Sequence, residues 1–334
     1  MFKKFIVLFL FFFSPHILMA QYAEHVAPEF IKTIQFIGST QQSQLPIIRL
    51  GEKISLSFDA LNGDEADYYY KITHHDFDWK LSDLSKGEYM DGFDDVRLYE
   101  YSNSFNTLRS YSHYMLNIPN RDTRKLTKSG NYMISIYDDE SELVFSKKFM
   151  IIENKVKVDA FVKRARNLKN IETKQVVQFV IDSPNLLLIN PNETVRTLIL
   201  QNSNLNNPII NLKPQYTIGS QLIYRYDKEA SFDAGNEYLF FDNKDIRAGS
   251  SSVRKIDLTD IYNTYLYTNS ARFERPYTYN PDINGNYQIR ILYPTNDISI
   301  EADYARVHFA LQYFEDLNDK EIHVYGNFNN YTID

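Results

Sequence analysis

Hydrophobic and polar residues alternate with a period of two along most of the chain. The clearest run is Ile54–Asp59, in which Ile, Leu and Phe alternate with Ser and Asp. Further runs cover residues 155–163, 177–181, 197–200, 222–226 and 305–311. Because successive side chains of a strand point to opposite faces, this pattern predicts many half-buried β-strands.

Helical signals are weak by comparison. No window keeps a capped apolar stripe at i, i+3, i+4 and i+7, so we expect only short helical turns near residues 79–84 and 242–247. Triplets such as Asn62-Gly63-Asp64 separate the strands at the intervals of a sandwich. The pattern therefore predicts an all-β chain of tandem antiparallel, Ig-like β-sandwich domains.

An internal similarity bears on the domain count. Residues 129–136 and 284–291 both read as a Gly turn that leads into a strand with Tyr and two Ile on one face. This favours two similar sandwiches in series. We place the first β-sandwich domain at residues 21–153 and the second at 154–302. Residues 303–334 are then the incomplete start of a third β-sandwich domain, unless they complete the second.

The first residues have the order of a secretory signal. Lys3 and Lys4 precede the apolar run Phe5–Phe13, and Ala20 offers a small residue at the cut. The run is too short to span a bilayer, so we predict a signal peptide at residues 1–20 and no membrane span. An uncleaved anchor is the alternative. With no cysteine in the chain, a lipid anchor is not expected.

The composition of the chain bears on which classes of molecule it could bind. The formal net charge is −7 and the isoelectric point is about 5.6, which argues against nucleic-acid binding. The chain holds 26 Tyr and 23 Phe but a single Trp. A large β content explains many of these rings, and Tyr is also enriched where proteins bind partners.

Two clusters suggest chemistry. His74, His75, Asp76 and Asp78 are metal-ligating types, and His113 is a distant candidate for the same site. Adjacent strand residues point to opposite faces, however, so His74 and His75 cannot both bind one ion from a strand. We favour a polar strand end anchored by a tryptophan.

The second cluster is acidic and comprises Glu88, Asp91, Asp94, Asp95 and Glu100. Paired carboxylates can hydrolyse glycosides, and a weak calcium site is conceivable, but a solvated acidic loop is the simpler interpretation. The sequence lacks nucleophile-elbow, dinucleotide-binding, phosphate-loop and zinc-protease motifs. We therefore assign no catalytic, cofactor-binding or metal-binding residue, and expect no cofactor.

The last stretch, His323–Tyr331, resembles the strand and turn that open glycogen-binding modules of the family 48 carbohydrate-binding type. Gly326 and the Asn residues are expected to form the turn and Phe328 to pack. Tyr331 stands where those modules usually have Trp.

Several runs in a shared order resemble the type IX secretion system plug protein family of Bacteroidetes. The resemblance covers residues from about Glu24 to Asp334 and rests on Ile31–Phe36, Pro46–Glu52, Tyr70–Trp79, Glu88–Phe93, Ser104–Thr107, Tyr111–Tyr114, Ser129–Tyr132, Asp282–Gly285 and Ala302–Tyr304, among others. His75, often Cys in relatives, and Tyr331 depart from the family pattern.

The resemblance implies a periplasmic, non-enzymatic protein of the Gram-negative envelope. Its partner would be the giant outer-membrane β-barrel translocon, whose periplasmic opening it would plug. We expect the free protein to be monomeric. A glycan-binding sandwich protein is the alternative, and a glycoside hydrolase is a third hypothesis that rests only on the acidic stretch.

Overall fold

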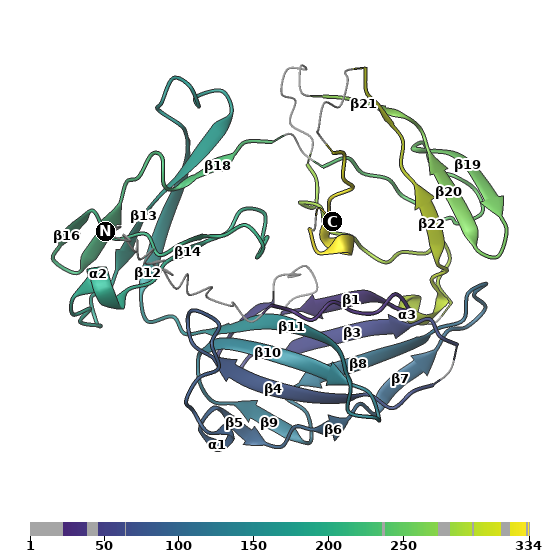
Figure 1. Cartoon of the computed structure of the whole chain (residues 1–334), viewed down its shortest axis with the longest axis horizontal. Coiled ribbons are helices and arrows are strands. Elements are labelled where there is room, and N and C mark those ends of the chain that lie inside the picture. The colour runs from purple at the N-terminus through teal and green to yellow at the C-terminus, as the bar shows by residue number, and fades with distance from the viewer. Residues whose placement is uncertain are drawn as a thin grey trace, which may run out of the picture.

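The computed structural model describes residues 23–38, 46–63, 65–235, 238–272, 281–295, 297–314, 321–331 and 333. The predicted signal peptide, residues 1–20, lies outside them. Strands dominate the described residues, which confirms the predicted all-β class. In Figure 1 a β-sandwich forms the base, and two further lobes stand above its two ends.

The first sandwich consists of two sheets. One has the order β1-β3-β8-β7, formed by Ile31–Ile37, Ile54–Ala60, Ser112–Ile118 and Glu100–Asn103. The other has the order β2-β11-β10-β4-β6, formed by Ile47–Arg49, Leu143–Ile152, Gly130–Tyr137, Tyr69–His75 and Val96–Arg97. Helix α1 (Lys86–Tyr89) and the pair β5 (Met90–Gly92) and β9 (Thr123–Leu126) complete it. All pairings are antiparallel except β2 with β11.

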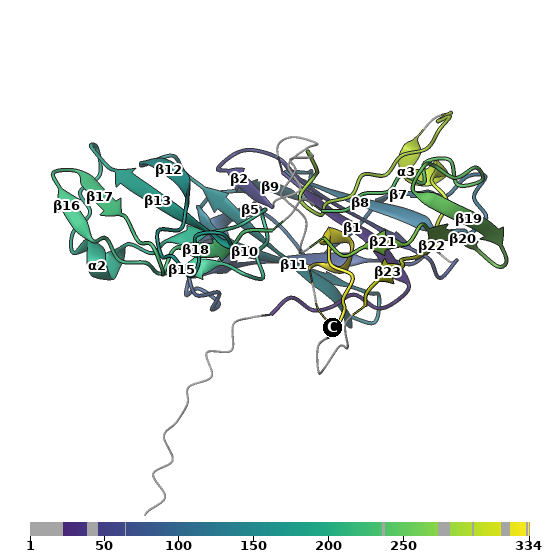
Figure 2. The same ribbon diagram turned by 90° about the horizontal axis from the view of Figure 1, so that it is seen from above.

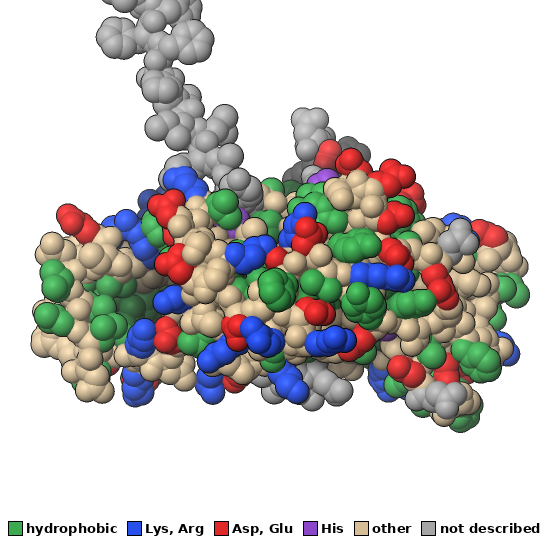
Figure 3. Space-filling model, turned by 90° about the horizontal axis from the view of Figure 1, so that it is seen from below, with side chains coloured by type: hydrophobic (Ala, Val, Ile, Leu, Met, Phe, Trp, Pro, Cys, Tyr) green, Lys and Arg blue, Asp and Glu red, His purple; other side chains and the backbone are tan. Residues whose placement is uncertain are grey.

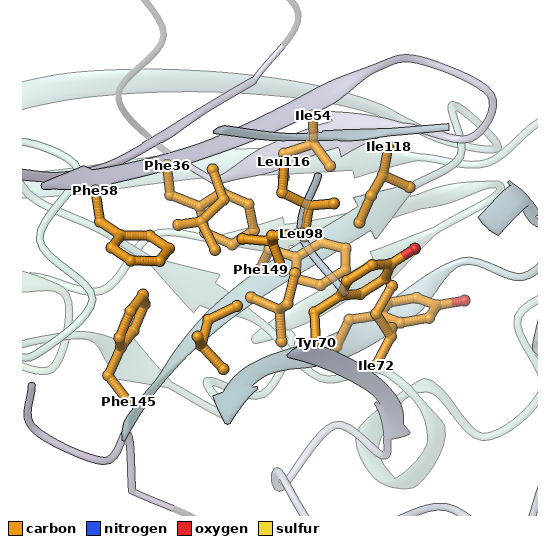
Figure 4. Close-up of a cluster of buried hydrophobic side chains, with 14 of the residues drawn as sticks. Phe36, Ile54, Phe58, Tyr70, Ile72, Leu98, Leu116, Ile118, Phe145 and Phe149 are labelled. Carbon is orange, nitrogen blue, oxygen red and sulfur yellow. The ribbon is translucent and has the colours of Figure 1, made fainter. Parts of the chain in front are cut away.

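Aromatic rings from both sheets meet in the core of this sandwich. Phe58 on β3 contacts Phe145 on β11 edge to face at 5.1 Å between ring centroids. Phe36 on β1 contacts Phe149 on β11 in the same way at 5.4 Å. Figure 4 shows these rings between the sheets, together with Ile72. Each fully buried side chain of this size stabilises the fold by about 1.5–3 kcal/mol, so the sandwich has a substantial core of its own.

The second lobe is built around the sheet β12-β13-β17-β16, formed by Lys157–Arg164, Lys174–Asp182, Gln221–Tyr224 and Tyr216–Ile218. Strand β18 (Ser231–Asp233) also pairs with β13, and α2 (Pro191–Thr194) and the pair β14 (Leu198–Ile199) and β15 (Ile209–Ile210) lie nearby. The buried centre of its core is small and comprises Phe179, Ile181, Leu222 and Tyr224. The second sheet layer that a full sandwich would have is represented only by short strands.

The third lobe contains the sheet β19-β20-β22, formed by Val253–Leu258, Tyr262–Leu266 and Ala305–His308, and the pair β21 (Asn269–Ser270) and β23 (Leu311–Gln312). Helix α3 (Ile298–Glu301) precedes β22, and the 3₁₀ turn η1 (Asn327–Asn329) follows β23. Strand β22 pairs in parallel with β20, so one sheet includes strands from both sides of the boundary expected at residues 302 and 303. The domain boundaries stay predictions.

Most of the predicted strands are confirmed, whereas both predicted helical turns are wrong. The alternating runs correspond to β3, β12, β13, β14, β17 and β22. The expected helical turn at 79–84 is wrong, because Trp79 has a positive φ of 65° and Leu81 returns to bridge with His75. The expected turn at 242–247 is also wrong, because the Asp242 and Asp245 side chains accept nearby backbone N–H groups and so favour bends over helix.

The strand expected at residues 286–291 is absent from the described structure, in which this segment belongs to no sheet. Tyr287 and Ile289 are nevertheless less exposed than Gln288 and Arg290. The alternation thus predicted which side chains face inward. Tyr287 faces the first sandwich, since its hydroxyl donates to the Ile34 carbonyl at 3.4 Å.

None of the helices in the described part of the chain is long or apolar enough to span a membrane.

Candidate functional site

The histidine cluster is part of the first sandwich. His74 lies against Tyr89 and Tyr132, and its Nδ1 is 2.8 Å from the Ser82 hydroxyl. His75 instead places its Nδ1 2.9 Å from the Trp79 carbonyl. The two imidazoles therefore serve different neighbours. Burial lowers the pKa of His75, which favours the neutral ring that these contacts use.

The tryptophan of this cluster anchors the strand end, as the sequence predicted. Trp79 is buried, and the Lys148 ammonium lies 4.5 Å from the centre of its ring. His113 is on another sheet, where it contacts Asp59 and not His74 or His75. Within the described residues, no group of three or more His, Asp or Glu side chains is placed to hold a metal ion.

The acidic stretch is engaged in separate contacts. Each carboxylate has its own partner, in the pairs Glu88–Ser85, Asp91–Arg124, Asp94–Lys86, Asp95–Lys71 and Glu100–Asn117. Asp94 also accepts the Ile72 backbone N–H at 2.6 Å. These contacts attach the loop to the sandwich, and they give the hydrolase hypothesis no pair of facing carboxylates.

The terminal motif forms the expected turn but not the expected strand. Gly326 donates its N–H to the Asn329 side chain at 3.1 Å, and η1 follows. Tyr331 is buried, and its hydroxyl donates to the Asn284 carbonyl at 2.8 Å. Phe328 is 56% exposed, which differs from the packing expected for it. The aromatic residue that replaces Trp therefore has a structural role here.

A buried polar cluster that the sequence did not predict joins the first sandwich to the third lobe. Asp59 on β3, only 3% exposed, accepts a hydrogen bond from the Tyr304 hydroxyl at 2.5 Å. His113 on β8 is the ladder partner of Asp59, and its Nδ1 lies 2.6 Å from the same carboxylate. The Thr33 hydroxyl lies 2.5 Å from Tyr304. We call Thr33, Asp59, His113 and Tyr304 the Asp59 cluster.

A bulge in β1 shapes one side of the Asp59 cluster. The register of β1 against β3 shifts between Lys32 and Gln35, and Thr33 has a φ of +52°. A positive φ is strained for a β-branched residue, and bulges redirect side chains. Thr33 lies within this bulge, and its hydroxyl contacts Tyr304. Burial, and then the Asp59 carboxylate, raise the pKa of the Tyr304 phenol far above its usual range, so it remains a donor.

Further hydrogen bonds surround the Asp59 cluster. The Tyr111 hydroxyl is within 2.9 Å of the Ser299 carbonyl and 3.0 Å of the Ala302 carbonyl. The Leu108 N–H donates to Asp303 at 2.6 Å. These contacts link residues almost 200 positions apart and cover the outer face of the sheet that contains β3 and β8. The first sandwich and this part of the third lobe are thereby fixed to each other.

A large cavity lies beside this junction. It has a volume of about 2320 Å³ and is lined by β1 and by three segments of the C-terminal half, residues 238–247, 281–295 and 301–311, with the terminal turn at 322–330. We call it the central groove. Figures 1 and 2 show η1 close to β1 on the side where the C-terminal segments gather.

The lining of the central groove combines exposed aromatic rings with ion pairs. Phe240 and Tyr293 are 81% and 83% exposed in its lining, and Lys244 and Arg290 pair with Asp242 there at 3.2 Å and 3.6 Å. Aromatic residues are enriched at protein–protein interfaces, so these exposed rings make the lining a candidate binding surface. In the sequence, His113 is a distant zinc candidate and part of one family run, and Tyr304 is part of another, so nothing there predicts that the two meet.

Comparison with known proteins agrees with this description. The sequence matches the family model described as "Type 9 secretion system plug protein 1st domain" over residues 31–153, a range that begins at β1 and ends just after β11. None of the curated proteins compared with the chain matches it. The crystal structure of a hypothetical protein from Parabacteroides merdae ATCC 43184 is similar, with 31% identity and a TM-score of 0.86 over 93% of this chain and 79% of that one.

Proposed function

Because the chain belongs to the type IX secretion system plug protein family, we propose that it is a non-enzymatic periplasmic protein that binds the outer-membrane translocon barrel and plugs its periplasmic opening. The family match carries this proposal. A type IX component fits a place in the envelope, and the signal peptide expected at residues 1–20 would deliver it to the periplasm.

The structure supports a blocking role through the size and the coupling of its parts. A plug must present a wide body that does not come apart when it is pressed against a pore. The Asp59 cluster ties the first sandwich to the third lobe through the buried contact of Asp59 with Tyr304. Figure 1 shows the resulting broad arrangement of base and lobes.

The central groove supplies a surface for the partner. Exposed rings such as Phe240 and Tyr293 bury large apolar area when a partner covers them. The paired charges beside them keep the free surface polar, as expected of an interface that also forms and dissociates.

Co-purification tests the proposal. The tagged chain, extracted from the envelope in mild detergent, is expected to retain a very large outer-membrane barrel. Phe240→Ser together with Tyr293→Ser should weaken this retention. Leu187→Ser is the matched control, since Leu187 is 84% exposed but lies on the second lobe, outside the groove lining. Absence of any barrel with the unaltered chain contradicts the proposal.

Glycan binding is the second candidate, and one observation favours it. Phe328 is exposed in the terminal turn, and its ring lies parallel to that of Phe309 at 6.4 Å between centroids. Exposed rings of this kind can stack on sugars. Calorimetry of the whole chain with soluble glucans distinguishes the two functions, because heat that is lost in Phe328→Ala indicates sugar binding.

A further inference from the structure

Strand β12 is the free edge of the sheet in the second lobe. It pairs with β13 along its whole length, from Lys157 opposite Asp182 to Arg164 opposite Gln175. Its other side pairs with no strand in the described part of the chain. Figure 2 shows β12 at one margin of the sheet and β16 at the other. All eight β12 residues are exposed, so the unpaired N–H and C=O groups of this edge are accessible.

The side chains of β12 are unusually apolar for an exposed edge. Val158 and Val162, 55% and 66% exposed, lie on the face of Phe179 and Ile181, the core residues of this lobe. Phe161, 59% exposed, lies on the opposite face. Figure 3 shows apolar side chains in and around a hollow at the end of the molecule where this lobe lies. An added strand would cover apolar groups on both faces.

The charges of β12 bear on the partner. Natural edge strands often carry Lys to prevent pairing, and β12 carries Lys157 and Lys163. It also carries Asp159, which contacts Lys157 at 2.8 Å. A strand with both signs repels a second copy of itself in some registers and attracts it in others, so the registers must be compared.

A two-fold dimer of antiparallel β12 strands must place one residue opposite itself, because the two-fold axis keeps each side chain on its own face of the sheet. Centring on Asp159 opposes two carboxylates, and centring on Ala160 opposes Lys157 to Lys163. Centring on Phe161 opposes Asp159 to Lys163 twice and Phe161 to Phe161. This last register joins opposite charges and aromatic rings, both of which stabilise cross-strand pairs.

We propose that β12 pairs antiparallel with β12 of a second copy of this chain, with Phe161 opposite Phe161. The pairing runs from Val158 to Arg164 on both strands. Ala160 and Val162 then lie opposite each other and extend the small core of each lobe across the interface. The proposal goes beyond the plugging function and does not depend on it, and it replaces the sequence-based expectation of a free monomer.

Charge reversal tests the register. Sedimentation of the whole chain over a range of concentrations is expected to show a dimer. In this register position 159 of each strand faces position 163 of the other. Asp159→Lys alone therefore places Lys opposite Lys twice, and Lys163→Asp alone places Asp opposite Asp twice. Each should weaken self-association about tenfold or more. The double variant Asp159→Lys/Lys163→Asp restores opposite charges and should recover the dimer.

Mixing provides a second readout that does not depend on folding of a new variant. The two single variants combined carry Lys opposite Asp at both positions, so they should form a mixed dimer that neither forms alone. Asp257→Lys is the matched control, because Asp257 forms the same kind of pair with Lys255 on β19 at 2.5 Å, and it should leave the dimer unchanged. A monomer at every concentration, or a mixture that stays monomeric, overturns the proposal.

Discussion

The Tyr304 hydroxyl donates a hydrogen bond to the Asp59 carboxylate, and this contact joins residues 245 positions apart. Asp59 belongs to a central strand of the first sandwich, whereas Tyr304 directly precedes β22 in the third lobe. The carboxylate is buried, and Tyr304 and His113 both contact it. The contact therefore holds two parts of the protein together. Its loss leaves the Asp59 carboxylate either exposed or buried without its tyrosine donor.

We predict that Tyr304→Phe lowers the free energy of unfolding by about 1–3 kcal/mol, because it removes a donor from a buried carboxylate while keeping the ring. That ring still packs against Tyr111 at 5.3 Å. Denaturant titration followed by circular dichroism measures the change. Tyr293→Phe is the control, since Tyr293 is 83% exposed and its loss should cost little. Equal losses in the two variants would contradict the role of the Asp59 contact.

Alkaline pH should destabilise the protein through its buried tyrosines. Burial raises the pKa of Tyr68 from its usual 10.0 to about 12. The stabilisation is complete below about pH 10 and is lost as the pH rises toward 12, because the unfolded chain releases the phenol proton first. Tyr68→Phe should reduce the loss between these values by up to about 2 kcal/mol. Unfolding measured at several alkaline pH values checks this, and an unchanged slope would refute it.

The sequence was sufficient to predict the strands because their pattern is local. In β3, Ile54, Leu56 and Phe58 are buried while Ser55 and Ser57 are less so, as the alternation requires. The alternation at Tyr287–Ile291 is equally clear, yet this segment forms no strand, and Tyr287 contacts the first sandwich. A period of two reports which side chains face inward, and the partner that covers them depends on tertiary structure.

The Asp59 cluster could not be predicted for the same reason. Asp59 ends the alternating run as an ordinary outward-facing polar residue, and nothing near it in the sequence indicates that it is buried. Only the fold brings His113 and Tyr304 to it. By contrast, Trp79 could be predicted as an anchor from its place at a strand end, because its carbonyl contacts His75, four residues away, although Lys148 reaches its ring from β11, which β10 separates from β4.

Glycine is required where β5 approaches β9. Gly92 has a φ of +113°, and a Cβ there would lie 2.0 Å from the Asp122 carbonyl oxygen. We expect Gly92→Ala to destabilise the protein by about 2 kcal/mol or more, because backbone atoms cannot give way easily. Gly87→Ala is the control, since Gly87 has open space and lies in a helix, where Ala stabilises by up to about 1 kcal/mol. Thermal unfolding of both variants should shift in opposite directions.

Mild acid should destabilise the first sandwich through His75. Burial, with smaller effects from His74 and Lys148, lowers the pKa of His75 below its usual 6.5. Below that value the unfolded chain binds a proton that the folded chain refuses, so this stabilisation is lost as the pH falls. Denaturant titrations at about pH 7.5 and about pH 5.5 bracket the usual value. The unaltered chain should lose up to about 1 kcal/mol more than His75→Gln between them.

The control for His75 is His25→Gln, because His25 is exposed and its replacement should leave the acid sensitivity unchanged. The carboxylates are the same in all three proteins, so their protonation cancels in the comparison. If His75→Gln is as acid-sensitive as the unaltered chain, the imidazole is not kept neutral by the fold. The contacts of His75 with Thr73 and Trp79 would then have to tolerate a charged ring.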